Sequence, residues 1–198
     1  DEVDAAFITL KLPAARIDLA NRLLQKGAAL ADTELTFELD AERTIEWPSP
    51  PRGLRVELRD TVEPEPFAGL AEEMRLSRFF SDPRVGEAKA LGLWRESLRN
   101  HCRGFADGLV VAYYEDRPCG IVTLRFSGDR LFFHIVGVMP EYQGKGVAAQ
   151  MIRKATEAYA LTHAIMVETQ AANHKAQALY KRCGFALKDV KYVLHYWK

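Results

Sequence analysis

The sequence predicts an α+β protein built on one mixed β-sheet. Short runs that alternate apolar and polar side chains, the pattern of half-buried strands, lie in the first forty residues and again from residue 54 onward. Amphipathic stretches with helical spacing separate them. From residue 54 the expected order is β-α-α-β-β-β-α-β-α-β, an antiparallel meander followed by a β-α-β crossover.

The N-terminal residues predict a small β-α-β unit. Residues 6–12 and 35–39 alternate as strands, and residues 14–26 carry an apolar stripe with helical spacing that Gly27 closes. A unit of this size buries too little apolar surface to stand alone. We therefore expect it to pack on the rest of the chain.

A proline-rich linker follows this unit. Residues 47–53 read Trp-Pro-Ser-Pro-Pro-Arg-Gly, which neither a helix nor a central strand accommodates. The predicted domains are therefore residues 1–46, the linker, and a main domain of residues 54–198.

The main domain opens with a strand at residues 54–58 and helical patterns at residues 66–78 and 86–102. Turn residues then punctuate a series of short elements. These are strands at 109–115, 119–126, 131–138, 165–169 and 190–197, a helix after the glycine-rich turn, and a short helix at 173–182.

Composition excludes several classes of partner. The 27 basic and 27 acidic residues cancel, so nothing favours nucleic acid or an anionic membrane as a partner. Cys102, Cys119 and Cys183 lack the spacing of a metal site or a disulfide framework, so we expect no metal and a reducing compartment. No run approaches the roughly 18 apolar residues of a membrane span. We expect a cytoplasmic protein without a signal peptide, although Asp1 is not an initiator methionine and a short piece is expected to precede it.

The most informative stretch is Val136–Ala148, an apolar strand that runs through a glycine-rich turn into a helix. The first turn of a helix has free N–H groups, and the helix dipole places partial positive charge there. Gly144 and Gly146 permit a tight turn and leave no side chain over the helix end. An ordinary strand–turn–helix could carry the same residues, but the junction is that of an anion site.

The spacing of the glycines selects among phosphate-binding loops. Lys145 is followed by Gly146 where a Walker loop needs Ser or Thr, and Ala149 stands where a dinucleotide fingerprint needs its third glycine. Residues 143–148 read Gln-x-x-Gly-x-Ala instead. That pattern resembles motif A of the GCN5-related N-acetyltransferases, the loop that cradles the pyrophosphate of acetyl-coenzyme A.

A second motif lies about 35 residues downstream. Asn173 is a good N-cap for the last helix, and Tyr180 lies two turns later on the same helix face, where a half-buried core tyrosine is the simpler interpretation. Together with Gly184-Phe185, these residues resemble motif B of the same superfamily. The resemblance implies that strands 131–138 and 165–169 splay apart and that Asn173 and Tyr180 line a cleft for the pantetheine arm.

The resemblance implies acetyl-coenzyme A as co-substrate and direct attack of an amine on the thioester. A tyrosine stays protonated at neutral pH, so Tyr180 is the expected general acid, and the backbone N–H of Val138 is the expected oxyanion donor. Cys183 is expected to be a packed thiol and not a nucleophile. The expected cofactor-binding residues are Gly137, Val138, Met139, Gln143, Gly144, Lys145, Gly146, Val147, Ala148, Asn173 and Tyr180.

The general base is less well defined by the sequence. His134 is expected on the same strand face as Val136 and Val138, with a reference pKa that suits a base. A histidine bonded within the sheet is the alternative. Glu168 on the neighbouring strand is a weaker candidate.

The acceptor has to be inferred from residues outside both motifs. Arg75–Asp82, Ala90–Leu98 and the tail Tyr192–Trp197 resemble the dTDP-fucosamine acetyltransferase branch, which implies a nucleotide-linked aminosugar as acceptor. Arginines suit a diphosphate and aromatic rings suit stacking, whereas a solvated helix face with core aromatics is the alternative. The candidate acceptor residues are Arg75, Arg78, Phe79 and Trp94.

Other functions remain open at this point. The acceptor could be a protein N-terminus, a polyamine or an antibiotic, or the chain could be a non-catalytic acyl-coenzyme A sensor. Tyr180 in register argues against a sensor, which needs no acid. The apolar tail, expected to be exposed, suggests a homodimer.

Overall fold

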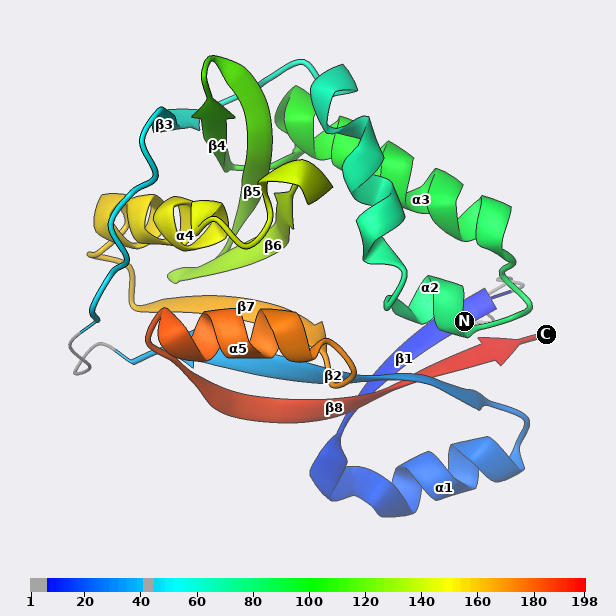
Figure 1. Cartoon of the computed structure of the whole chain (residues 1–198). Helices are drawn as coiled ribbons and strands as arrows, with labels where there is room; N and C mark the ends of the chain where they lie inside the picture. The colour runs from blue at the N-terminus through cyan, green and yellow to red at the C-terminus, as the bar shows by residue number, and fades with distance from the viewer. Residues whose placement is uncertain (1–6, 41–44) are drawn as a thin grey trace.

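One sheet of eight strands runs through the part of the chain that the structure, a computed structural model, describes: residues 7–40 and 45–198 (Figure 1). The strands are β1 (Phe7–Pro13), β2 (Ala29–Leu39), β3 (Leu54–Arg59), β4 (Gly108–Tyr114), β5 (Arg117–Ser127), β6 (Arg130–Val138), β7 (Ala164–Gln170) and β8 (Phe185–Trp197). Their order across the sheet is β1-β8-β2-β7-β6-β5-β4-β3, and only β6 and β7 run parallel. The predicted mixed α+β fold is confirmed.

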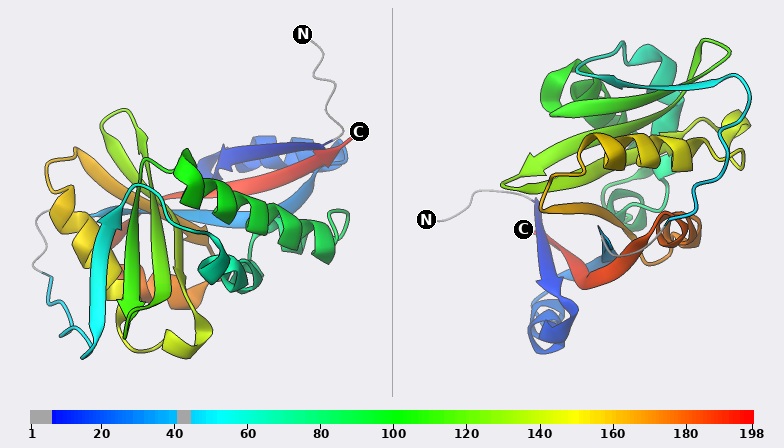
Figure 2. Two further views of the ribbon diagram at one scale, coloured as in Figure 1. Left: turned by 90° about the horizontal axis from the view of Figure 1, so that it is seen from above. Right: turned by 90° about the vertical axis from the view of Figure 1, so that its left-hand side faces the viewer.

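Helices cover both faces of this sheet (Figure 2). One face carries α1 (Ile17–Gln25), α4 (Val147–Ala158) and α5 (His174–Arg182), and the other carries the 3-10 segment η2 (Glu65–Met74), α2 (Arg78–Ser81) and α3 (Glu87–Asn100). Shorter turns are η1 (Ala14–Arg16), η3 (His101–Phe105) and η4 (Pro140–Tyr142). None of the described helices combines the length and the apolar character needed to cross a bilayer.

The N-terminal β-α-β unit contributes strands to the same sheet. β2 pairs with β7 on one side and with β8 on the other, and β1 pairs with β8. The division of the chain at residues 47–53 remains a prediction. The tail is not the exposed segment that we expected, because β8 lies between β1 and β2 and buries Val193, Leu194 and His195. The expected exposure of the tail, on which the predicted homodimer depended, is therefore wrong.

The helix expected at residues 66–78 is wrong in kind. Residues Glu65–Met74 form tight 3-10 turns, and α2 begins only at Arg78. Ser77 interrupts the path with an extended backbone, φ −73° and ψ 154°. Its hydroxyl accepts a hydrogen bond from the Trp94 indole N–H at 2.7 Å, which ties the break to α3. The other predicted helices and strands are confirmed within a few residues, although β2 and β8 are longer than expected.

A β-bulge in β6 determines which side chains reach each face. Phe133 and Ile135 pair with two consecutive residues of β5, so His134 between them is the extra residue of the bulge. The Ile135 N–H donates a hydrogen bond to Thr123 Oγ1 at 3.1 Å. Phe133 and Val136 pack on the α4/α5 side, whereas Ile135 packs against η2 and α3. Two consecutive residues therefore turn away from α4, and strict alternation fails at this point.

The parallel pair β6–β7 is short. Arg130–Phe133 pair with Ala164–Val167, and no pairing continues beyond, although β6 extends to Val138 and β7 to Gln170. The predicted splay of the two strands is confirmed, and it opens a gap inside the sheet.

Candidate active site

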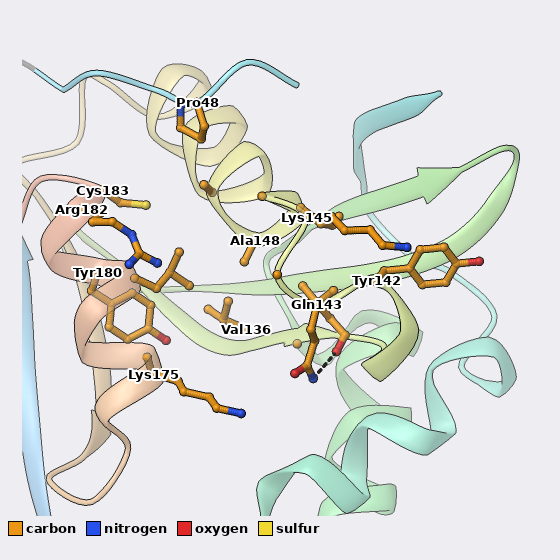
Figure 3. Close-up of a pocket in the computed structure, with 18 of the residues that line it drawn as sticks. Pro48, Val136, Tyr142, Gln143, Lys145, Ala148, Lys175, Tyr180, Arg182 and Cys183 are labelled. Carbon is orange, nitrogen blue, oxygen red and sulfur yellow. Dashed lines mark hydrogen bonds between the residues drawn. The ribbon is translucent and has the colours of Figure 1, made fainter. Parts of the chain in front are cut away.

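A cavity of about 1460 Å³ lies where β6 and β7 part (Figure 3). Residues of α4, α5 and the glycine loop line it from one face of the sheet. Met74 and Leu76, at the end of η2 and just beyond it, line it from the other face. A cavity with walls on both faces has to pass between two strands, so the gap beyond Phe133 and Val167 connects the two faces.

The glycine loop leaves the end of α4 open. Gly144 and Gly146 have φ of 72° and 82°, left-handed values that favour glycine, and a Cβ at either would meet nothing within 4 Å. Gly146 is the N-cap of α4, and no side chain caps the helix. The N–H groups at Val147, Ala148 and Ala149 therefore face the cavity without a side chain over them, which is the geometry of an anion site.

Two loop side chains fix the loop and leave the anion site clear. The Lys145 ammonium lies over the rings of Tyr142 and Tyr114, 5.3 and 5.7 Å from their centroids, and points away from the cavity centre (Figure 3). The Gln143 amide donates to the Val138 carbonyl at 3.1 Å and to Glu73 Oε2 at 2.9 Å. The loop is thereby fastened to β6 and to η2.

The Val138 backbone N–H is directed into the gap. The neighbouring Met139 N–H donates to the Cys119 carbonyl of β5 at 2.9 Å. Because successive N–H groups of a strand point to opposite sides, the Val138 N–H points away from β5 and toward the side that β7 has left. Beside it, a Cβ on Gly137 would lie 2.9 Å from Leu70 Cδ1, so any larger residue at this position would require the Leu70 side chain to shift.

Tyr180 reaches the cavity from α5. Its ring is packed near Phe37 and Phe185, with centroids 6.0 and 6.1 Å away, and its hydroxyl points into the cavity (Figure 3). Within the described chain, that hydroxyl has no hydrogen-bond partner. Burial, and secondarily the nearby Cys183, raises the pKa of Tyr180 well above its usual value, so the phenol is a neutral donor at physiological pH.

Asn173 caps α5 and also lines the cavity. Its Oδ1 accepts a hydrogen bond from the Ala176 N–H at 3.1 Å, so the structural interpretation of this residue is confirmed. Cys183 lines the cavity as well, and burial raises the pKa of its thiol to about 11. A thiol with so little thiolate at neutral pH is a packing group, as expected.

The cap gives a stability prediction. Asn173→Ala should lower the free energy of unfolding by about 1 kcal/mol, because the Ala176 N–H loses its acceptor. Thermal or urea unfolding followed by circular dichroism measures the change. Asn173→Asp is the matched control, since its carboxylate can accept the same bond. An alanine variant as stable as the parent would show that the cap contributes nothing.

Comparison with known proteins identifies the chain. Residues 69–185 match the model of the acetyltransferase (GNAT) family. The chain belongs to this family. The spore coat polysaccharide biosynthesis protein SpsD of Bacillus subtilis is 27% identical over 123 residues, which cover 61% of this chain and 43% of SpsD.

Solved structures support the same fold. A GCN5-related N-acetyltransferase from Sphaerobacter thermophilus has a TM-score of 0.63 at 16% identity, over 97% of this chain and 60% of that one. A functionally unknown conserved protein from Staphylococcus epidermidis has a TM-score of 0.68 at 16% identity, over 98% and 73%. This member of the GNAT family thus spans less than half of SpsD and about three fifths of the Sphaerobacter chain.

Several cavity residues of this GNAT-family chain were not predicted. Trp47, Pro48 and Ser49 of the linker form part of the wall, and the Gln150 amide of α4 donates to the Pro48 carbonyl. The proline content of this segment indicated a break in secondary structure, but it did not indicate that the segment lines a cavity. Lys175 and Arg182 also line the cavity, and their seven-residue spacing on one helix, flanking Tyr180, could have placed them there.

The four candidate acceptor residues lie outside this cavity. Arg75 forms a 2.6 Å ion pair with Glu87, and Trp94 is a packing residue bonded to Ser77. The Arg78 guanidinium lies 4.5 Å from the centroid of the Phe79 ring. All four lie on the η2/α2/α3 side, the side to which the cavity passes. Their role in acceptor binding remains a prediction.

His134 is on the opposite face from the one that we predicted. The bulge turns it toward η3, where its ring stacks on His101 with centroids 4.7 Å apart, and it does not line the cavity. Desolvation of the ring where it stacks on His101, and then the charge of His101, lowers the pKa of His134 below its usual value, although the residue as a whole is exposed to solvent. The ring is therefore uncharged at neutral pH and a weak base. The expectation that it shares a face with Val136 and Val138 is wrong.

Proposed function

We propose that the chain transfers the acetyl group of acetyl-coenzyme A to a primary amine. The observation that carries this proposal is the cavity through the sheet, with the open end of α4 on one face and the Tyr180 hydroxyl along its wall. A long donor that enters past the glycine loop would reach the gap with its acyl group facing the η2 side. An acceptor arriving on that side would then meet it.

The side chains and backbone of the gap suit direct transfer. An uncharged amine attacks the thioester carbon, and the Val138 N–H stabilises the oxyanion that forms. The C–S bond then breaks, Tyr180 gives its proton to the leaving thiolate, the nitrogen releases its extra proton to water, and Tyr180 recovers a proton from water. The free N–H groups at the start of α4, those of Val147, Ala148 and Ala149, hold the pyrophosphate. No acyl-enzyme is needed, because the only cavity-lining thiol among the described residues, Cys183, is neutral.

For the acceptor, we propose the 4-amino group of a dTDP-linked aminodideoxyhexose. The resemblance of residues 75–98 and the tail to the dTDP-fucosamine branch supports it, as does the similarity to SpsD, a spore coat polysaccharide biosynthesis protein. Arg78 adds a physical argument. Within the described chain this half-buried guanidinium forms no ion pair, and its buried Nε has no hydrogen-bond partner. An acidic group of the acceptor would pair with the charge of this guanidinium.

The same proposal places the protein in the cytoplasm. All three cysteines are buried and unpaired, which fits the reducing cytoplasm.

A thiol-release assay tests the function. Purified protein with acetyl-coenzyme A should release free thiol with nucleotide-linked aminosugars and much less with peptides, polyamines or aminoglycosides. If the protein preferred a peptide, a polyamine or an aminoglycoside, the proposed acceptor would be wrong and the proposed acetyl transfer would stand. Tight acetyl-coenzyme A binding without turnover of any amine would favour a sensor and contradict the enzyme.

A further inference from the structure

A segment that lies outside the matched family region of residues 69–185 closes one side of the cavity. All of residues 45–49, here called the wall segment, line the cavity together with residues of α4 and α5. The Gln150 amide of α4 donates to the Pro48 carbonyl. A Cβ on Gly184, just beyond α5, would lie 2.7 Å from Ile45 Cδ1, so Ile45 packs against that turn. The wall segment therefore bridges the two helices that flank the cavity.

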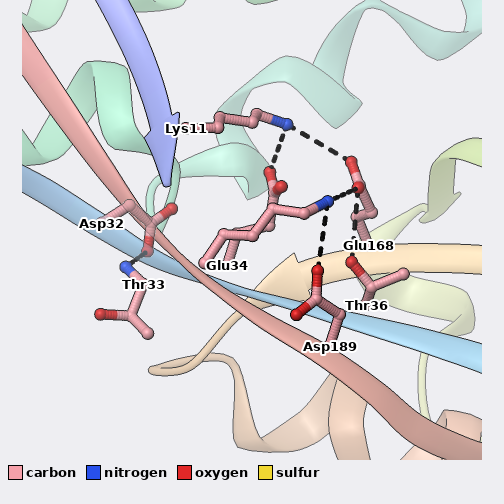
Figure 4. A network of polar contacts seen from close by, with 8 residues as sticks. Lys11, Asp32, Thr33, Glu34, Thr36, Glu168 and Asp189 are labelled. Carbon is pink, nitrogen blue, oxygen red and sulfur yellow. Dashed lines mark hydrogen bonds and ion pairs between the residues drawn. The ribbon is translucent and has the colours of Figure 1, made fainter. Parts of the chain in front are cut away.

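The strand that leads into the wall segment is held in the sheet by ion pairs as well as by strand pairing (Figure 4). Lys11 Nζ of β1 lies 2.7 Å from Glu34 Oε2 of β2 and 3.4 Å from Glu168 Oε2 of β7. Lys191 Nζ of β8 lies 3.3 Å from Glu168 Oε1, and the Thr36 hydroxyl of β2 donates to the same oxygen at 3.4 Å. Because the network joins four strands at one carboxylate, β2 is fixed relative to β7, which flanks the gap.

The wall segment lies close to the anion site. Gln150, which holds Pro48, is three residues beyond Val147, the first residue of α4. Three residues of an α-helix rise about 4.5 Å along its axis. Pro48 is thus bonded to the same first turn of α4 whose free N–H groups face the cavity.

The proposed position of the coenzyme directs its nucleoside toward this segment. The acyl arm takes the gap between β6 and β7, and the pyrophosphate takes the open end of α4. The nucleoside is attached to the other side of the pyrophosphate, so it remains on the face of the sheet that carries α4 and α5. The wall segment bounds the cavity on that face.

The side chains around this part of the cavity differ in character. Trp47 of the wall segment is half-buried, packs against the main core and lines the cavity. Glu46 beside it carries a negative charge, which disfavours a phosphate against the wall segment. Lys175 and Arg182 of α5 point into the cavity (Figure 3), and neither forms an ion pair with a described residue. The wall segment therefore suits an uncharged aromatic base, whereas α5 suits a phosphate.

We propose that the wall segment binds the adenosine end of the coenzyme, with the adenine stacked on the Trp47 indole and the 3′-phosphate facing Arg182. The linker that follows the N-terminal unit is then part of the donor site. This inference rests on the proposed use of acetyl-coenzyme A.

The experiment measures by calorimetry the Kd of the full chain for three ligands of decreasing length. Coenzyme A has every group, dephospho-coenzyme A lacks the 3′-phosphate, and 4′-phosphopantetheine lacks the adenosine. Trp47→Leu should raise the Kd for the first two about 10-fold and leave that for 4′-phosphopantetheine unchanged, because only the first two carry a base that can stack. Arg182→Met should raise the Kd for coenzyme A alone, also about 10-fold.

Two further variants serve as controls. Trp47→Phe keeps an aromatic ring and should retain most of the affinity that the leucine variant loses. Arg153→Met removes an arginine of α4 that pairs with Glu157 at 2.7 Å and does not line the cavity, so all three constants should stay at their parent values. Unchanged binding of 4′-phosphopantetheine shows in each variant that the protein is folded.

Fluorescence gives a second measurement that does not need the leucine variant to fold. Adenosine 3′,5′-bisphosphate should quench the tryptophan emission of the parent protein, because a base stacked on an indole quenches it. Trp94 and Trp197 do not line the cavity, so the quenching should be lost in Trp47→Phe. Quenching that persists in this variant would overturn the assignment of Trp47.

The calorimetry separates the failure of this inference from the failure of the proposed function. If Trp47→Leu weakens all three ligands equally, or none of them, the wall segment does not bind the base and the inference is overturned. If the three ligands show the expected pattern but the parent protein acetylates no amine, the wall segment keeps its assignment and the proposed acetyl transfer fails.

Discussion

Tyr180→Phe should reduce kcat about 10²-fold while leaving the affinity for acetyl-coenzyme A nearly unchanged. The phenol is the one buried hydroxyl of α5, it faces the cavity, and burial keeps it protonated. Without it, the thiolate has to leave unprotonated or take its proton from water. General acid catalysis normally raises the rate of such a step by about 10²-fold or more. Phenylalanine keeps the contacts with Phe37 and Phe185, so packing is preserved.

Steady-state rates and a direct binding titration separate the two parts of this expectation. Tyr159→Phe is the matched control, because Tyr159 packs against Phe126 at 5.7 Å and does not line the cavity. Equal loss of rate in both variants would indicate a packing effect. An unchanged rate in Tyr180→Phe would remove its role as the acid.

The fold was largely predictable because the spacing of apolar residues along the sequence indicates which side chains are buried. Alternating strands, amphipathic helices and the two motifs at residues 143–148 and 173–185 all depend on neighbours within the chain, and the structure confirms their positions. The 3-10 path of η2 was missed because its apolar spacing alone suggested an α-helix, and the extended backbone at Ser77 ended the predicted helix before Arg78.

What could not be predicted depends on pairing between distant strands. The face of His134 follows from a bulge that only the register of β5 against β6 reveals. The network at Glu168 joins residues 11, 34, 168 and 191, which no local pattern connects. The wall formed by Trp47–Ser49 likewise depends on where α4 lies. Sequence reasoning thus placed the residues of the glycine loop and of α5 better than the residues whose position depends on strand pairing.

Gly146→Ala should weaken acetyl-coenzyme A binding about 10-fold. At φ 82° an alanine is strained by roughly 1–2 kcal/mol, and the backbone can relieve that strain only by rotating at the N-cap of α4. Rotation would turn the first-turn N–H groups away from the pyrophosphate. Losing one hydrogen bond to a charged group costs about 1.5 kcal/mol or more, which corresponds to a tenfold change in affinity.

Gly128→Ala separates binding from strain. Gly128 also has a left-handed φ, 62°, and a Cβ there would likewise meet nothing within 4 Å, but it lies in the turn between β5 and β6 and does not line the cavity. Both variants should therefore lose similar stability, about 1 kcal/mol in urea unfolding. Only Gly146→Ala should raise the Kd for coenzyme A measured by calorimetry. Equal affinities in the two variants would mean that the open end of α4 does not bind the pyrophosphate, and the donor would then have to enter the cavity elsewhere.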